Sequence, residues 1–172
     1  MIHPHLVLKK SRIAEKGVFA KKNIPKGTIL FIVNNTYAII YTKEQVAKFS
    51  KRYKKILDNF AYGYNGFVIY DRGINKYWNH SCNPNCISYK DKMIALRDIK
   101  LGEEITYDYY FDERGESKQL LVVRNKCKCG SSKCRGILKP HSAKDAILLE
   151  GVRDDAARYI SKVKQPLLRG LQ

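Results

Sequence analysis

Near its middle the sequence reads Lys76-Tyr77-Trp78-Asn79-His80-Ser81-Cys82-Asn83-Pro84-Asn85-Cys86. This stretch places an aromatic pair, an Asn-His pair and two cysteines within eleven residues. We expect Tyr77 and Trp78 to anchor the segment in an apolar core, because aromatic side chains bury large apolar surfaces. Asn79 and His80 offer hydrogen-bond donors and acceptors, and Cys82 offers a soft ligand for a metal. The stretch therefore predicts anchoring, recognition and metal binding at one place.

Two later segments carry related chemistry: Gly102-Glu103-Glu104-Ile105-Thr106-Tyr107-Asp108-Tyr109 and Cys127-Lys128-Cys129-Gly130-Ser131-Ser132-Lys133-Cys134. Cys127 and Cys129 are too close in sequence to pair easily, so ligation of zinc accounts better for the spacing of these thiols. A tetrahedral structural zinc site needs a fourth ligand, and spacing alone leaves Cys82 and Cys86 as alternatives.

Taken in order, Asn79-His80-Ser81-Cys82 with Pro84-Asn85, the segment 102–109, and the C-x-C-x4-C pattern resemble the SET-domain protein lysine methyltransferases. The resemblance covers roughly residues 5–138. It implies a SET domain over 5–112 and a zinc-binding segment, called post-SET in this family, over 123–139. It does not reach residues 141–172, where capping and apolar spacing predict a C-terminal helical extension.

The fold class follows from both lines of argument. Short apolar runs separated by glycine turns predict a mostly β architecture with peripheral helices. The resemblance implies small curved sheets of the β-clip-like SET fold. It also implies a pseudoknot in which the Asn-His segment threads beneath a loop, a topology that pattern alone does not predict.

For the cofactor, the resemblance implies S-adenosylmethionine, with Asn79 and His80 holding its adenosyl part. Backbone near Lys16, Gly17 and Val18 and two residues beside the zinc cysteines, Lys128 and Gly130, would complete the pocket. The family carries a Gly-x-Gly at the first of these positions, whereas here Glu15 replaces its first glycine.

For catalysis and zinc, the resemblance assigns Tyr109 as the catalytic tyrosine and Tyr107 as a position that influences how many methyl groups fit. It selects Cys82 as the ligand that joins Cys127, Cys129 and Cys134 around zinc. Methyl transfer requires a neutral lysine amine, and an aromatic channel favours that form because desolvation disfavours the ammonium.

The chain carries a formal charge of +17, which predicts attraction to nucleic acid or another polyanion that weakens with salt. Thr42 to Asn59 reads as one helix with a capping box and a lysine-rich outer face. This face is a candidate for DNA or nucleosome binding, with plain solubility as the alternative. Seven acids between Asp98 and Glu116, against two bases, predict an acidic rim that suits a basic protein substrate.

The function predicted is therefore lysine methylation of a basic protein, such as a histone or another DNA-packaging protein. Two alternatives stay open: a non-catalytic, zinc-stabilised module that binds nucleic acid or chromatin, and a methyltransferase of a non-histone protein such as a ribosomal one. No signal peptide and no membrane-spanning run is visible, so an intracellular location without membrane contact is expected. The location would be the nucleus or chromatin in a eukaryote and the cytoplasm otherwise.

Overall fold

The computed structural model describes residues 2–32, 38–64, 66–89, 92–110 and 126–138. Within these ranges thirteen elements follow one another along the chain. They are β1 Leu6–Lys10, β2 Lys16–Ala20, β3 Ile29–Ile32, β4 Ala38–Tyr41, α1 Lys43–Ala47, α2 Lys51–Phe60, β5 Ala61–Tyr64, β6 Phe67–Asp71, the 3-10 helix η1 Gly73–Tyr77, β7 Asn79–His80, β8 Cys86–Tyr89, β9 Lys92–Ala95 and β10 Glu104–Tyr107. This content confirms a mostly β fold with few helices.

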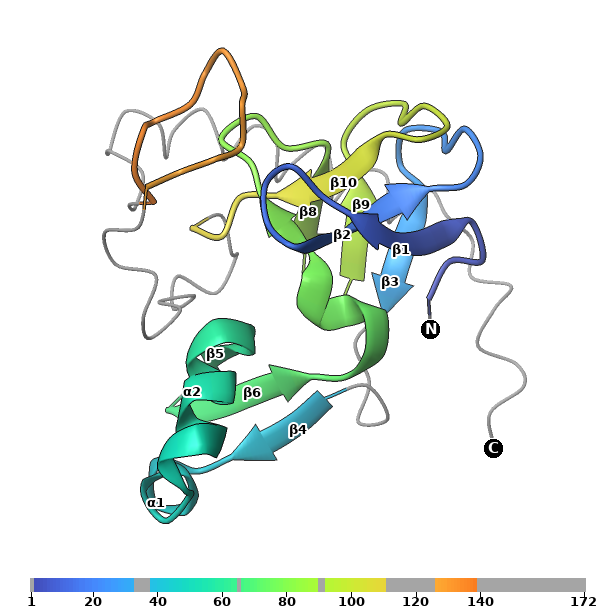
Figure 1. Cartoon of the computed structure of the whole chain (residues 1–172). Coiled ribbons are helices and arrows are strands. Elements are labelled where there is room, and N and C mark those ends of the chain that lie inside the picture. Colours follow the sequence, from blue (N-terminus) through green and yellow to red (C-terminus); the bar gives the residue numbers. More distant parts are fainter. Residues whose placement is uncertain (1, 33–37, 65, 90–91, 111–125, 139–172) are drawn as a thin grey trace, which may run out of the picture.

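The strands form three small sheets, with the orders β1-β2-β10-β7, β3-β9-β8 and β4-β6-β5. The first two lie together in the upper part of Figure 1, and the third forms a separate lower layer with α1 and α2. Within the described residues, the chain passes from the lower layer to the upper one through η1, which Trp78 joins to the two-residue strand β7. The Asn-His pair therefore begins where the lower layer joins the upper one.

Apolar side chains of the first two sheets make one core. Val18, Leu30 and Ile105 are fully buried there, and Trp78 packs against them with 6% of its surface exposed. Consecutive residues are buried in β2, β3, β8, β9 and β10, so these short strands are covered on both faces. The anchoring role predicted for Trp78 is confirmed by its place in this cluster, while Tyr77 is partly buried against it.

The helix predicted over 42–59 is divided in two. Thr42 forms the expected capping box with Gln45 at the start of α1, but α1 ends at Ala47 and a second cap begins α2. Ser50 is extended, with ψ 152°, and its side chain accepts a hydrogen bond from the Tyr53 N–H. A serine that caps the next turn competes with helix continuation, and this local bond explains the break.

The lower layer has its own small core. Leu57 of α2 and Val68 of β6 are buried, and Tyr41, Phe49 and Tyr53 stack edge to face beside them, with ring centroids 5.0 to 6.4 Å apart. The Tyr41 and Tyr53 hydroxyls lie 2.9 Å apart. Because this aromatic cluster uses the apolar face of α2, the opposite face of the helix is left to the basic side chains.

Some predicted features lie outside the described residues: the helical extension 141–172 and the join between the two predicted domains over 111–125. Their boundaries, 5–112 and 123–139, remain predictions. Among the described helices, none combines the length and the apolar content needed to cross a bilayer.

Candidate functional site

A parallel pairing between β7 and β10 brings the Asn-His pair beside the Thr-Tyr segment. Asn79 lies opposite Thr106, and His80 lies opposite Tyr107. The Ser81 N–H then donates to the Tyr107 carbonyl at 3.0 Å and prolongs the contact. Asn79 and His80 are 6% and 3% exposed, so their polar groups must find partners within the protein.

The Asn79 amide is held by three acceptors. Its Nδ2 donates to Glu104 Oε1 at 2.6 Å, to the Lys16 carbonyl at 2.9 Å and to Ser11 Oγ at 3.3 Å. The second Glu104 oxygen accepts the Ser11 hydroxyl at 2.8 Å, and Ser11 in turn accepts the Ile13 N–H. Glu104 therefore ties the loop after β1 to the Asn-His strand, although it lies 93 residues after Ser11 and 25 residues after Asn79.

Gly17 makes this arrangement possible by having no side chain. A Cβ built at Gly17 would overlap the Glu104 carboxylate and lie 2.9 Å from Asn79 Nδ2. Any larger residue must push Glu104 away and break its bonds to Asn79 and Ser11. The glycine is thus required by packing in this protein, independently of any role toward a ligand.

We expect Gly17→Ala to lower stability by about 1–3 kcal/mol, the usual cost of overpacking a filled site, and to weaken ligand binding at the cavity described below. Thermal unfolding and calorimetric titration measure the two effects. If the clash with Glu104 is the cause, then Gly17→Ala will cost little in a Glu104→Ala background. Full additivity of the two changes would contradict this account.

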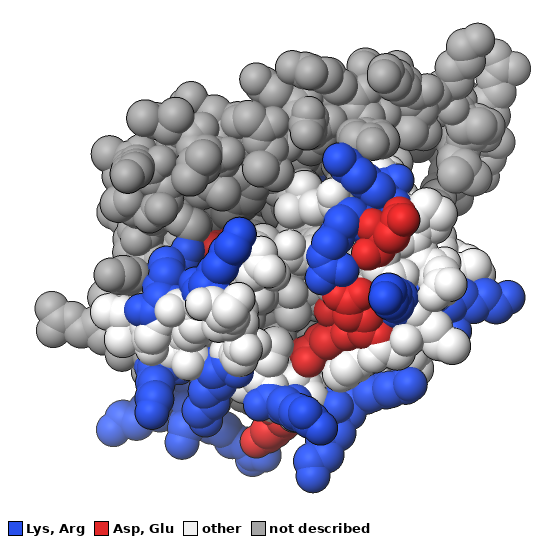
Figure 2. Space-filling model, turned by 90° about the horizontal axis from the view of Figure 1, so that it is seen from above, with Lys and Arg blue, Asp and Glu red and all other residues white. Residues whose placement is uncertain are grey.

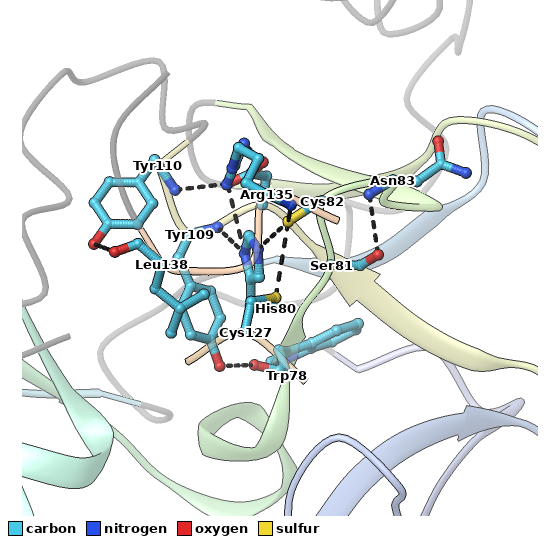
Figure 3. A network of polar contacts seen from close by, with 11 residues as sticks. Trp78, His80, Ser81, Cys82, Asn83, Tyr109, Tyr110, Cys127, Arg135 and Leu138 are labelled. Atoms are coloured by element: carbon cyan, nitrogen blue, oxygen red, sulfur yellow. Dashed lines mark hydrogen bonds and ion pairs between the residues drawn. The ribbon is translucent and has the colours of Figure 1, made fainter. Parts of the chain in front are cut away.

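His80 faces two partners through its two ring nitrogens. The Tyr109 N–H donates to Nδ1 at 3.2 Å, which assigns the proton of the neutral ring to Nε2. Nε2 lies 3.2 Å from Cys82 Sγ, and Asp108 Oδ1 lies 3.5 Å from Nδ1 (Figure 3). The ring thereby joins the end of β10 to the cysteine cluster.

Tyr109 directs its hydroxyl to the backbone of the Asn-His segment. Its Oη donates to the Trp78 carbonyl at 3.0 Å, and its ring lies 5.2 Å from the His80 ring (Figure 3). The Tyr107 ring lies 5.0 Å from the Tyr109 ring. Burial raises the pKa of Tyr109 above its ordinary value, so the hydroxyl stays protonated at neutral pH. The phenol is therefore a fixed neutral group among aromatic rings.

Four cysteine thiols converge at the other side of His80. The sulfurs of Cys82, Cys127, Cys129 and Cys134 all lie within 4.8 Å of one another, and the Cys82 and Cys127 sulfurs are 3.8 Å apart. Tetrahedral zinc with Zn–S bonds of about 2.3 Å separates its sulfurs by roughly 3.8 Å. The donor set and its spacing therefore fit a structural zinc ion, and Cys82 is the cysteine that lies beside the C-terminal three. Its role as a zinc ligand remains a prediction.

Cys86, the alternative fourth ligand on spacing alone, is excluded. Its side chain is completely buried in the core, and Sγ donates to the Thr106 carbonyl at 3.2 Å. Burial raises the pKa of this thiol well above its ordinary value, which opposes thiolate formation. The two cysteines differ because Cys86 is the first residue of β8 and its side chain lies in the core, whereas Cys82 precedes this strand.

The cysteine segment is also fixed by an ion pair. Arg135 donates to both Asp108 oxygens, at 2.7 and 3.0 Å, and the two side chains are 14% and 2% exposed. The Arg135 N–H also reaches Cys82 Sγ at 3.3 Å. Breaking a buried bidentate pair costs about 3–5 kcal/mol, because the remaining charge is left unpaired. Arg135 therefore fastens residues 126–138 to the end of β10.

A cavity of about 370 Å³ opens between these segments. This volume lies within the roughly 300–1,000 Å³ that small-molecule and cofactor sites occupy. It is lined by Ile13, Ala14, Asn79, His80, Tyr109, Lys126, Cys127, Lys128 and Leu138. Its walls thus come from the loop after β1, from β7 and the residues after β10, and from the cysteine segment.

Of the predicted cofactor residues, Asn79, His80 and Lys128 line this cavity, as does the predicted catalytic Tyr109. The others lie around it. Lys16 contributes its carbonyl to Asn79, while Gly17 is packed behind and Val18 is fully buried in the core. Tyr107 touches the ring of Tyr109, and Gly130 is an exposed turn residue with φ 66°. Their roles toward a cofactor remain predictions.

Several residues important to the geometry were missed by the sequence argument. Glu104 and Ser11 position Asn79, while Asp108 and Arg135 position the cysteine segment. A weak signal existed for Asp108, because strand alternation turns it away from Tyr107 and Tyr109 and toward a different partner. Nothing in the pattern marks Ser11 or Arg135, since their partners lie far away in sequence.

Four acids of the predicted acidic rim lie in the described residues, and each has a partner within the protein. The role of the rim toward a substrate remains a prediction. Glu103 pairs with Arg97 at 2.5 Å, and Asp98 accepts the Lys26 N–H at 2.8 Å. Glu104 accepts hydrogen bonds from Asn79 and Ser11, and Asp108 pairs with Arg135. Acidic groups do gather among Lys and Arg on the face seen from above in Figure 2. The later acids of the predicted rim lie outside the described residues.

Comparison with known proteins supports one family. The family model described as the SET domain matches residues 15–110. A histone-lysine N-methyltransferase of Schizosaccharomyces pombe, H3 lysine-4 specific, is 35% identical over 143 residues, which is 74% of this chain and 14% of that protein. The counterpart of the same description in Chaetomium globosum is 32% identical over 75% of this chain and 13% of its own length. The chain thus spans a small part of these relatives.

Solved structures give the same fold at lower identity. The methyltransferase domain of human histone-lysine N-methyltransferase SETMAR aligns over 83% of this chain and 60% of that chain, with TM-score 0.56 and 21% identity. A putative histone methyltransferase of Plasmodium falciparum aligns over 65% of this chain and 98% of its own, with TM-score 0.50 and 20% identity. Because the SET-domain family model matches residues 15–110 and the fold is shared with these solved structures, the chain belongs to the SET-domain family.

Proposed function

We propose that this chain transfers methyl groups from S-adenosylmethionine to lysine side chains of a basic protein, with histone tails as the substrate class. The observation that carries the proposal is the cavity in which Asn79, His80 and Tyr109 meet the cysteine segment. The relatives named histone-lysine N-methyltransferase support the same reaction. Because the chain covers a small part of those proteins, the activity of this chain requires its own test.

The cavity suits a cofactor with both polar and charged parts. Asn79 and His80 supply polar groups deep in the cavity, and Ile13 and Leu138 supply apolar surface for a planar ring. Lys128 brings a positive charge to the wall, which suits a carboxylate. S-adenosylmethionine contains all of these groups, and when bound it supplies an electrophilic methyl group on a sulfonium.

The residues around Tyr109 suit the amine that accepts the methyl group. A lysine amine has an ordinary pKa of about 10.4, so it must lose a proton and its water before it can attack. The Tyr107, Tyr109 and His80 rings form a weakly polar surface, which disfavours an ammonium by desolvation. The Tyr109 oxygen, whose proton is engaged by the Trp78 carbonyl, keeps lone pairs that can accept an N–H of the amine and orient it.

The test is incubation of the purified chain with methyl-labelled S-adenosylmethionine and a panel of histones, ribosomal proteins and a histone H3 tail peptide. We expect label in histones, at lysine. Label confined to ribosomal proteins would instead favour the non-histone alternative. Absence of label on every protein, with cofactor binding intact, would favour a non-catalytic chromatin-binding module and overturn the proposal.

Tyr107 provides a test of the product. Its ring lies 5.0 Å from the Tyr109 ring, close enough for its hydroxyl to fill space that an added methyl group would need. We expect the native protein to give mainly mono- or dimethyl-lysine, and Tyr107→Phe to shift the product toward higher methylation. Mass spectrometry of a peptide at matched turnover measures this. Trimethyl-lysine as the main early native product would contradict it.

The proposal extends to location and partners. A histone substrate places the protein at chromatin, in the nucleus of a eukaryotic cell. The charge of +17 supports contact with DNA or nucleosomes as well as with the substrate protein. Localisation of a tagged chain by microscopy, with and without nuclease treatment, tests this part of the proposal.

A further inference from the structure

We propose that the helix pair α1–α2 carries a docking surface for double-stranded DNA. The surface consists of the five exposed basic side chains Lys43, Lys48, Lys51, Arg52 and Lys55, and we call it the basic face. It belongs to the lower layer of the fold, apart from the cavity and the cysteine segment (Figure 1). Binding through this surface does not depend on the methyltransferase activity proposed above.

The charges of the basic face are only partly compensated. Two exposed acids share these helices, Glu44 next to Lys43 and Asp58 one turn after Lys55. Within the described part of the chain, no ion pair joins any of the five basic side chains to an acid. Lys54 differs, because it is half-buried and donates to the Ala47 carbonyl at 2.7 Å, which connects α2 to the end of α1. Clustered like charges repel one another and destabilise a helix, so this excess of positive charge has an electrostatic cost without a partner.

The orientation of the basic face is fixed by packing. Tyr53 and Leu57 point toward the sheet β4-β6-β5, where Leu57 is buried and the Tyr53 ring stacks with Phe49. At 100° per residue, Lys51, Arg52 and Lys55 lie on the opposite side of α2. The helix cannot rotate without exposing its apolar side, so the three cations are held in one direction.

An acidic protein is a poorer fit than a nucleic acid. Protein interfaces are depleted in lysine and place aromatic or apolar anchors at their centre. The large apolar side chains that are exposed in the described residues are Ile40, Phe67, Leu101 and Ile137, and none belongs to α1 or α2. A surface rich in Lys and Arg without such an anchor is typical of contact with phosphates.

A duplex fits better than a single strand. Proteins that bind single strands stack bases on exposed aromatic rings. Beside the helix pair, Tyr41, Phe49 and Tyr53 are engaged with one another by edge-to-face packing and are unavailable for stacking. The exposed ring of this layer, Phe67, belongs to β6 and not to α1 or α2. The ten residues of α2 span about 15 Å, a length over which duplex DNA carries roughly nine phosphate charges. The duplex therefore offers enough phosphates for all five cations.

The test measures binding of a labelled DNA duplex of about 20 base pairs to the full chain over a range of salt concentrations. We expect the triple variant Lys51→Gln, Arg52→Gln, Lys55→Gln to bind at least about tenfold more weakly near 0.1 M salt. Its plot of log K against log salt should be less steep by about 2.7, which is about 0.9 for each lost phosphate contact. Equal thermal unfolding of variant and native protein verifies that the fold is intact.

A matched control removes the same charge elsewhere. Lys21 and Lys22 follow β2, Lys100 precedes β10, and all three are exposed. The strands β2 and β10 lie in the upper layer, away from α1 (Figure 1). The triple change of these lysines to Gln should leave affinity within about twofold and the salt slope within about one unit. An equal loss in both triple variants, no binding of duplex at low salt, or preference for single-stranded RNA would each overturn the proposal.

Methylation assays separate this inference from the proposed function. If both hold, the α2 triple variant keeps its activity on a free histone peptide and loses activity on nucleosomes. If the native chain binds duplex DNA but methylates no protein, the proposal for the basic face is supported and the proposed function is refuted. If the α2 triple variant methylates nucleosomes and binds duplex DNA as well as the native chain does, only the proposal for the basic face is refuted.

Discussion

Tyr109→Phe will lower methyl transfer by at least roughly a hundredfold while S-adenosylmethionine still binds. The substitution removes one oxygen, which donates to the Trp78 carbonyl and lies in the cavity wall beside His80. Loss of a positioned polar group at a reacting centre typically costs about 10²–10³ in rate. The ring remains, so apolar contacts and the cavity shape are preserved.

Calorimetry for cofactor affinity and single-turnover methylation of a histone peptide separate binding from chemistry. Tyr53→Phe is a suitable control, because it removes the same hydroxyl from the aromatic cluster of the lower layer, where it contacts Tyr41. We expect the control to retain activity within about twofold, as its lost bond contributes only about 0.5–1.5 kcal/mol to folding. Unchanged turnover in Tyr109→Phe would mean that another residue orients the amine.

The second large effect concerns zinc. We expect about one zinc ion per chain, because four cysteine sulfurs converge with the spacing of a tetrahedral site. Cys127→Ser should lose the ion and, with it, both cofactor binding and activity, since residues 126–138 form one wall of the cavity. Structural zinc contributes its binding free energy directly to folding, so the loss should also lower the temperature of unfolding.

Metal analysis by mass spectrometry, before and after treatment with a chelator, measures the stoichiometry. Cys86→Ala is the matched control, because this thiol is buried in the core and lies outside the cluster. It should retain one zinc ion per chain. Zinc-free protein that remains fully active, or Cys127→Ser protein with one zinc ion, would contradict the structural role of the cluster.

The sequence predicted which chemical groups form the site better than it predicted the contacts that hold these groups in place. The three clustered cysteines, the Asn-His pair and the tyrosine segment are local patterns, and their residue types limit what they can bind. Asn79 needs Glu104, Ser11 and the Lys16 carbonyl, which lie 25, 68 and 63 residues away. Contacts of this range depend on strand pairing, which a single sequence does not specify.

One other expectation failed for a local reason. The periodic apolar face over 42–59 hid a break, because Ser50 caps a new helix through one hydrogen bond that leaves the periodicity almost unchanged. The acidic rim, inferred from a count of acids, remains a prediction, and a count does not show which carboxylates pair internally. Glu103 and Asp108 both do, with Arg97 and Arg135.

The division of the cavity between distant segments has a consequence for synthesis on the ribosome. Cys82 precedes Cys127 by 45 residues, which at about 5–20 residues per second is a delay of roughly 2–9 s. Because β10 and Asp108 are also made before the cysteine segment, for part of this interval a nascent chain holds paired β7 and β10 without the wall that Arg135 fastens to Asp108. The cavity can therefore bind a ligand only late in synthesis, after the strands of the upper sheets have had time to pair. A chain whose translation stops before the cysteine segment would present an open half-site.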